Sequence, residues 1–192
     1  MKNSIVLYSG SFDPFHVGHY FVANMAFIAT DAKLIVFEVS TEHPIKGKIK
    51  KEDLKERIAA IKHSVGMLPF AVHLNTAPKY LDKAIKYASD GYDSITFVVG
   101  SDVWQKWGDS FVDDFRDFSL IPVKFLVFAR EGYRDNLLIE PNLLHKASFS
   151  LTIPEQYGNL SSSQLRREKA ESGNYNHPSV EEIYNNNKNK IK

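Results

Sequence analysis

Two histidines near the N-terminus stand in a short turn whose composition suits anion chemistry. His16 and His19 lie three residues apart within the run at 10–19, which reads G-S-F-D-P-F-H-V-G-H. If His16 lies at the start of a helix and His19 in its first turn, both imidazoles face the same side. Each can then donate a hydrogen bond to a phosphate. Fixed donors and cations suffice for phosphoryl or nucleotidyl transfer, because charge develops on the phosphate oxygens in the transition state.

The segments on either side of this turn must position the histidines. The continuous apolar run at 5–8 predicts a strand that is buried on both faces of a parallel sheet, and residues 17–30 form an apolar helical pattern. A strand that leads through a glycine-containing turn into a helix builds an anion site, since backbone N–H groups and the helix dipole point at one place. We therefore predict that this turn binds an anion such as a phosphate group.

Apolar runs and helical patterns alternate along the rest of the chain. We expect an irregular basic loop over 41–51, because this stretch is polar and is interrupted by Pro44 and Gly47. The expected strands are 33–40, 70–75, 94–99, 123–128 and, more weakly, 147–151, and the expected helices are 52–63, 78–88, around 110–117 and 179–185.

This alternation predicts an α/β fold. Strands that alternate with helices indicate a Rossmann-like, doubly wound architecture with a mainly parallel sheet of five to six strands and helices on both faces. We expect a single nucleotide-binding domain over 1–185, followed by a polar tail over 186–192 without fixed structure.

Polar residues follow several of the predicted strands. In doubly wound sheets, ligands bind at the carboxyl ends of the strands, where the strand order switches. Lys46 follows the second strand, the stretch 100–102 follows the fourth, and Arg130 follows the fifth. Serines at 161–163, just before Arg166, are an N-cap signal for a second helix N-terminus. We expect these groups to converge on the same edge of the sheet as the histidines.

The composition of the chain excludes several kinds of site and gives no sign of some kinds of partner. The chain has 192 residues, of which 43% are hydrophobic, and its formal net charge of +1 gives no reason to expect a nucleic-acid or membrane partner. The absence of cysteine excludes disulfides, a thiolate nucleophile and cysteine metal ligands, and it is compatible with a reducing compartment. Neither a transmembrane run nor a secretory signal is present. We expect a cytoplasmic protein that acts on small molecules, with a homo-oligomer left open.

Three stretches carry a resemblance to a known family. The run at 10–19 resembles the G-x-F-D-P-x-H-x-G-H signature of the nucleotidyltransferase α/β phosphodiesterase superfamily at every position. The stretch 100–107, G-S-D-V-W-Q-K-W, is similar to the G-[AS]-D…W segment of nicotinate and nicotinamide mononucleotide adenylyltransferases, and 160–166, L-S-S-S-Q-L-R, is similar to their I-S-S-T-x-I-R motif. Arg130 and the H-P-S-V stretch at 177–180 also resemble that pattern. The resemblance implies transfer of AMP from ATP to one of these mononucleotides, with release of pyrophosphate, in NAD biosynthesis.

The resemblance also implies a role for each matching position. The catalytic residues would be His16, His19 and Arg166, which bind ATP phosphates and stabilise the transition state. The remaining ATP-binding residues would be Gly10, Ser11, Phe12, Gly18, Gly100, Asp102, Ser162 and Ser163. The mononucleotide-binding residues would be Lys46, Arg57, Trp104, Trp107 and Arg130. Mg²⁺ would arrive with its waters on the triphosphate. A protein-bound metal is not expected, since the H-x-x-H spacing differs from the H-E-x-x-H zinc pattern and no third ligand stands nearby.

Each feature also has a simpler structural explanation. Asp102 and the serines at 161–163 can cap helices, and Lys46 can be one of several solvated lysines. Trp104 and Trp107 can pack in the core or at its rim, and only one of them can face a ligand.

Two other functions stay open. One is a different nucleotidyltransferase, such as a phosphopantetheine adenylyltransferase or a cytidylyltransferase. Cytidylyltransferases typically show R-T-x-G-[IV]-S-T-[ST] near the second helix, and residues 160–166 lack its opening Arg-Thr and Gly, which favours adenine. The other is a nucleotide-binding module without turnover.

Overall fold

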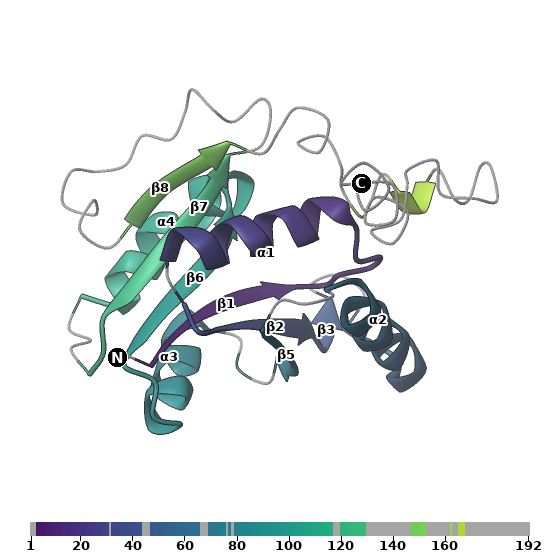
Figure 1. Cartoon of the computed structure of the whole chain (residues 1–192), viewed down its shortest axis with the longest axis horizontal. Helices are drawn as coiled ribbons and strands as arrows, with labels where there is room; N and C mark the ends of the chain where they lie inside the picture. The colour runs from purple at the N-terminus through teal and green to yellow at the C-terminus, as the bar shows by residue number, and fades with distance from the viewer. Residues whose placement is uncertain are drawn as a thin grey trace, which may run out of the picture.

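The protein is built around a six-stranded parallel sheet (Figure 1). This computed structural model describes residues 3–30, 32–43, 47–65, 69–75, 77, 79–116, 120–129, 147–152, 162 and 165–167. The strands are β1 (Ser4–Gly10), β2 (Leu34–Ser40), β5 (Phe70–Asn75), β6 (Ser94–Gly100), β7 (Val123–Ala129) and β8 (Ala147–Thr152). Their order is β5-β2-β1-β6-β7-β8, and every neighbouring pair is parallel. The predicted Rossmann-like sheet is confirmed.

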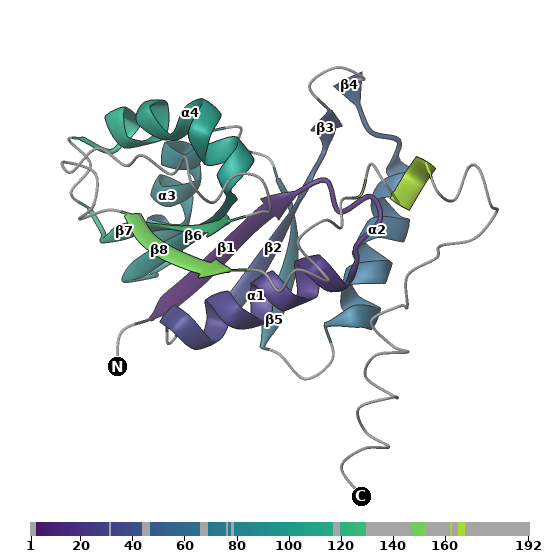
Figure 2. The same ribbon diagram turned by 90° about the horizontal axis from the view of Figure 1, so that it is seen from above.

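Helices cover both faces of the sheet. The described ranges contain the helices α1 (Val17–Thr30), α2 (Lys51–Ser64), α3 (Tyr80–Ser89) and α4 (Ser101–Asp114). Figure 2 shows α1 and α2 on one side and α3 and α4 on the other. Among the helices of the described ranges, none is both long and apolar enough to cross a membrane.

The central strands are apolar at nearly every position because each buries both of its faces. Successive side chains of a strand point to opposite sides. On β1, Val6 packs in the core beneath α1 and α2, whereas Ile5 and Leu7 pack in the core beneath α3 and α4. Continuous apolar runs are typical of such doubly covered strands, and this explains why their predicted positions agree with the structure to within about two residues.

Helix α4 begins earlier than the sequence predicted. The expected helix was centred on 110–117, but α4 starts at Ser101, directly after β6, and ends at Asp114. Asp102 lies in its first turn, where a negative charge complements the helix dipole. Both Trp104 and Trp107 therefore lie on α4, ahead of the range where the helix was expected.

The basic stretch after β2 contains a short hairpin, so the prediction of an irregular loop over 41–51 was wrong. Strands β3 (Glu42–His43) and β4 (Gly47–Lys48) pair antiparallel, with Glu42 opposite Lys48. Opposite charges across a strand pair are favourable, and Gly47 adopts the positive φ of 72° that a turn can require. The hairpin projects from the carboxyl end of β2 (Figure 2).

Strands β1 and β6 separate toward their carboxyl ends. β1 pairs with β2 as far as Gly10 and Val39, but it pairs with β6 only as far as Tyr8 and Val98. β6 continues beside β7 to Gly100. On one side of β1 the sheet continues through β2 to β5, and on the other side it continues through β6 and β7 to β8. This switch in strand order is where open α/β sheets bind ligands.

Candidate functional site

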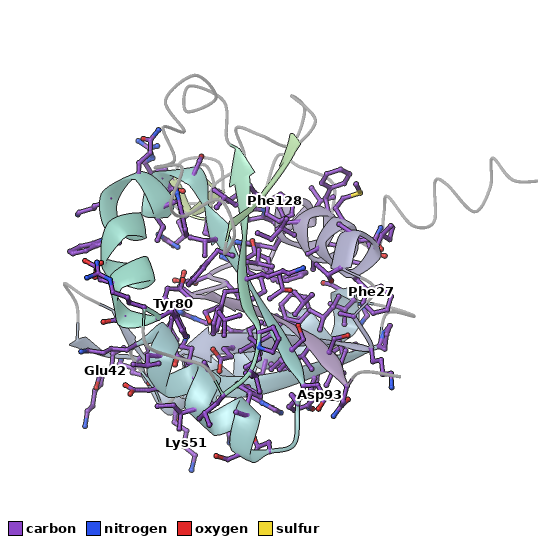
Figure 3. All side chains as sticks on the ribbon, turned by 90° about the vertical axis from the view of Figure 1, so that its left-hand side faces the viewer. Phe27, Glu42, Lys51, Tyr80, Asp93 and Phe128 are labelled. Atoms are coloured by element: carbon purple, nitrogen blue, oxygen red, sulfur yellow. The ribbon has the colours of Figure 1, made fainter. Side chains whose placement is uncertain are left out.

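A cavity of about 650 Å³ lies at the switch point between β1 and β6. Its volume is typical of small-molecule sites, which range over roughly 300–1,000 Å³. Tyr80 of α3 and Phe128 of β7, which are both labelled in Figure 3, line the cavity. The predicted site residues on its wall are Gly10, Ser11, Phe12, His19, Arg57, Gly100, Asp102, Ser162 and Arg166. The fold thus brings together residues from both ends of the chain.

The two histidines of the turn lie against each other. The ring centroids of His16 and His19 are 3.7 Å apart; His16 is buried, and His19 lines the cavity. The backbone N–H of His16 donates to Nδ1 of His19 at 3.3 Å. An Nδ1 that accepts a hydrogen bond places the proton of the neutral imidazole on Nε2. The ring also stacks on Phe15, with centroids 5.5 Å apart, so both its orientation and its tautomer are defined.

Two arginines from distant segments hold the turn itself. Oδ2 of Asp13 lies 3.0 Å from Nη2 of Arg57 and 3.4 Å from Nη1 of Arg166. Arg57 also donates from Nη1 to the carbonyl oxygen of Ser11 at 3.1 Å, and Arg166 contacts the carbonyl oxygen of Asp13. Ser162 donates from Oγ to the carbonyl oxygen of Pro14 at 3.1 Å. Asp13 therefore ties α2 and the segment near 162–167 to the turn.

Within the turn, Phe12 lies over Gly10. Phe12 has a φ of 46°, in the left-handed region that non-glycine residues seldom adopt, and its ring is buried. A Cβ added to Gly10 would lie 3.1 Å from Cζ of that ring. Close packing against the Phe12 ring therefore favours glycine at this position.

Basic residues of the β3–β4 hairpin and of the segment after it line the cavity. Lys48 of β4 and Lys50, just before α2, line the cavity, and so does Arg57 of α2. Sequence analysis singled out Lys46 in this basic stretch, which lies outside the described residues, and missed Lys50. The signal was the repeated lysine pattern K-G-K-I-K-K at 46–51.

The two tryptophans occupy different environments on α4. Trp104 is buried, with its ring centroid 5.3 Å from that of Phe125. Trp107 is 50% exposed, with the ammonium group of Lys106 at 5.2 Å from its ring centre. Neither indole is among the described residues that line the cavity. Stacking of one of them on a pyridine ring stays a prediction.

Comparison with known proteins agrees with this arrangement. A model of the cytidylyltransferase-like family matches residues 7–168. The chain belongs to the cytidylyltransferase-like family. It is thus a nucleotidyltransferase, as the resemblance of the turn at 10–19 predicted.

Individual relatives of this nucleotidyltransferase carry more detailed names. A probable nicotinate-nucleotide adenylyltransferase of Pelagibacter ubique is 29% identical over 180 residues, which cover 86% of this chain and 93% of that protein. A protein of Endomicrobium trichonymphae with the same name is 27% identical over 178 residues, covering 86% and 85%. The nicotinic acid mononucleotide adenylyltransferase of Plasmodium falciparum, solved in complex with NaAD, shares the fold, with a TM-score of 0.65 and 18% identity over 87% of this chain and 83% of that one.

Sequence analysis missed a pair of buried charges that lies beside the cavity of this nucleotidyltransferase. Glu38 of β2 and Lys83 of α3 form an ion pair, with Nζ and Oε2 2.8 Å apart. Burial lowers the pKa of the Lys83 ammonium, and the adjacent Glu38 carboxylate opposes that shift. The same carboxylate and burial together raise the pKa of Tyr80 and of Tyr87. The signals were a single glutamate in an apolar strand and a lysine on the apolar side of a helix.

The remaining predicted site residues lie away from the cavity wall or outside the described ranges. Gly18 is buried in the first turn of α1 and is not among the described residues that line the cavity. Ser163 and Arg130 fall outside the described residues, as does the expected helix at 179–185 and the tail at 186–192. Their assigned roles stay predictions.

Proposed function

We propose that this nucleotidyltransferase transfers AMP from ATP to nicotinate or nicotinamide mononucleotide and releases pyrophosphate, a step of NAD biosynthesis. The observation that carries the proposal is the fixed His19 ring at the cavity wall, beside a turn that Arg57 and Arg166 hold through Asp13. The names of the Pelagibacter and Endomicrobium relatives support this choice of substrates.

In the proposed reaction, an oxygen of the mononucleotide phosphate attacks the α-phosphorus of ATP in line. A new phosphorus–oxygen bond forms as the bond between the α-phosphorus and the bridging oxygen to the β-phosphate breaks. The negative charge that develops on the phosphate oxygens is stabilised by hydrogen bonds from His16 and His19 and by the guanidinium of Arg166. No protein nucleophile is needed for this step.

We assign the two substrates to different parts of the cavity. ATP would lie along the turn at 10–12, with its ribose near Asp102 after Gly100 and its β- and γ-phosphates near Ser162, Ser163 and Arg166. Lys48, Lys50 and Arg57 line the cavity. Together with Lys46, which the sequence predicts, they would supply the positive charge for the phosphate of the mononucleotide.

Mg²⁺ belongs to the ATP substrate in this proposal. The described residues hold no group of three or more His, Cys, Asp or Glu side chains that could bind a metal ion. Asp13, the carboxylate of the turn, already lies between two guanidinium groups. The chain therefore suits an ion that enters coordinated by the triphosphate and its own waters.

The test is a pyrophosphate-release assay with a matrix of substrates. The purified protein is incubated with Mg²⁺ and either ATP or CTP, together with nicotinate mononucleotide, nicotinamide mononucleotide or phosphopantetheine. We expect release with ATP and at least one pyridine mononucleotide. Release only with CTP or only with phosphopantetheine would replace this proposal with a different transferase, and nucleotide binding without release would indicate a binding module.

A further inference from the structure

A buried ion pair lies next to the cavity, and stability alone gives little reason for it. Glu38 is 2% exposed and Lys83 is 3% exposed. Removing two charges from water is costly, and apolar replacements of a buried pair are often equally or more stable. The pair sits between two otherwise apolar surfaces, the β2 strand and the inner side of α3. This prompts the question of what else the pair holds in place.

The Glu38–Lys83 ion pair also binds the side chain of Ser9, a residue of the cavity wall. Oγ of Ser9 donates to Oε2 of Glu38 at 2.7 Å and accepts from Nζ of Lys83 at 2.7 Å. Ser9 and Glu38 are register neighbours on β1 and β2, which places both side chains on the α3 face of the sheet. Hydrogen bonds to charged groups are short and strong, so the hydroxyl is held from two sides.

Ser9 stands where β1 loses a neighbour. The pairing between β1 and β6 ends at Tyr8, so Ser9 and Gly10 pair only with β2. The phosphate-binding turn begins at the next residues. Lys83 reaches this point from α3 and contacts β1 at Ser9, the first residue beyond its pairing with β6. The ion pair therefore restrains the end of β1 at the mouth of the cavity.

Lys83 also touches a second cavity residue. Its ammonium group lies 5.4 Å from the ring centre of Tyr80, which lines the cavity and packs edge-on against Phe97. A cation over an aromatic face is attracted by the ring quadrupole. One buried charge thus contacts two side chains of the wall.

We propose that Lys83 is a positioning residue of the active site, which acts through Ser9 to fix the end of β1 and with it the turn at 10–19. Glu38 supplies the counter-charge and orients both partners. The effect on turnover rests on the proposed function, whereas the effect on the turn itself does not.

The test compares two hydroxyl deletions on the same carboxylate. Ser9→Ala removes the link to β1 and leaves the Glu38–Lys83 ion pair, while Tyr87→Phe removes the 3.2 Å hydrogen bond to Oε1 of Glu38 at a residue away from the cavity wall. Hydrogen exchange of the peptide covering 10–15 is measured by mass spectrometry, with kcat and KM for ATP measured in parallel. Ser9→Thr, which keeps the hydroxyl, serves as the rescue.

We expect Ser9→Ala to speed exchange of the turn about tenfold and to lower kcat about tenfold with a smaller change in KM, and Lys83→Met to do the same. Tyr87→Phe should leave exchange of the turn and kcat within about twofold of the wild type, and Ser9→Thr should restore both. Unchanged exchange in Ser9→Ala, or equal changes in Ser9→Ala and Tyr87→Phe, would overturn the inference. If the wild type releases no pyrophosphate, the proposed function fails, and the exchange comparison still decides the role of Lys83.

Discussion

Arg166 and Asp13 are 153 residues apart in the sequence, yet Nη1 of Arg166 lies 3.4 Å from Oδ2 of Asp13. Arg57 contacts the same oxygen at 3.0 Å. The carboxylate thereby joins three segments of the chain at the wall of the cavity. Asp13 is 40% exposed, so solvent screens these pairs and their contribution to stability is small, about 1 kcal/mol or less for each. Their main effect is to fix the positions of the guanidinium groups of Arg57 and Arg166.

Asp13→Asn tests this consequence. Removing the charge should release Arg57 and Arg166 from their common partner and raise KM for ATP about tenfold, the equivalent of about 1.4 kcal/mol. The thermal midpoint should change by only a few degrees. The matched control is Asp113→Asn, which breaks the exposed 2.6 Å pair between Asp113 of α4 and Arg116 just after it, and should leave KM unaltered. Equal kinetics in both variants would remove Asp13 from this role.

Gly10→Ala tests the packing of the turn. The added methyl group would meet the buried Phe12 ring at 3.1 Å, so the ring or the turn must move. Overpacking of this kind costs about 1–3 kcal/mol of unfolding free energy. We also expect turnover to fall at least about tenfold, because Phe12 contacts His19 edge to face at a centroid distance of 5.1 Å.

The control for this variant is Gly91→Ala. Gly91 has a φ of 88° and open space around its missing Cβ, so alanine there strains the backbone without a clash. It should lower stability and leave turnover intact. A denaturant titration and a steady-state assay on both variants separate the two effects, and full activity of Gly10→Ala would show that the turn tolerates the methyl group.

Tyr87 should make the protein less stable in alkali. Its pKa is raised in the folded state by burial and by Glu38, so folded Tyr87 keeps its proton while the unfolded phenol loses it above pH about 10. The stability contribution is fully present below that pH and is lost as the pH rises further. The lowered pKa of Lys83 acts in the opposite direction, since the unfolded chain then binds more protons.

The difference between wild type and Tyr87→Phe isolates this group. Thermal midpoints measured from about pH 8 to about pH 11, a range that spans the pKa of about 10 of an unfolded tyrosine, should fall more steeply for the wild type. Parallel curves for the two proteins would mean that Tyr87 ionises equally in the folded and unfolded states.

Much of the fold was predictable because the central strands are buried on both faces. The apolar runs of β1, β2 and β6 leave no helical alternative of sufficient length, and their alternation with helices determines the parallel sheet. The start of α4 was missed because the helix was expected only around 110–117, although the spacing of three between Trp104 and Trp107 fits one side of a helix.

The strand–turn–helix arrangement around 10–19 was predictable because its signature is local, whereas the residues that support the turn are distant in the sequence. Nothing near Asp13 in the sequence names Arg57 or Arg166 as its partners. Similarly, Glu38 is visible as one charge in an apolar strand, but its partner Lys83 depends on the register of β2 with β1 and on the docking of α3. These pairs join residues that are far apart in the sequence, so they can be identified in the folded chain but not from local sequence patterns.

The central claim is that His19 stabilises the transition state of nucleotidyl transfer. The most direct measurement is kcat and KM for pyrophosphate release with Mg²⁺-ATP and the preferred mononucleotide, in the wild type, in His19→Ala and in His63→Ala as an exposed histidine control on α2. Loss of a transition-state donor should lower kcat about 10²–10³-fold in His19→Ala, with a smaller change in KM for ATP. His63→Ala should match the wild type. Wild-type turnover in His19→Ala would contradict the account.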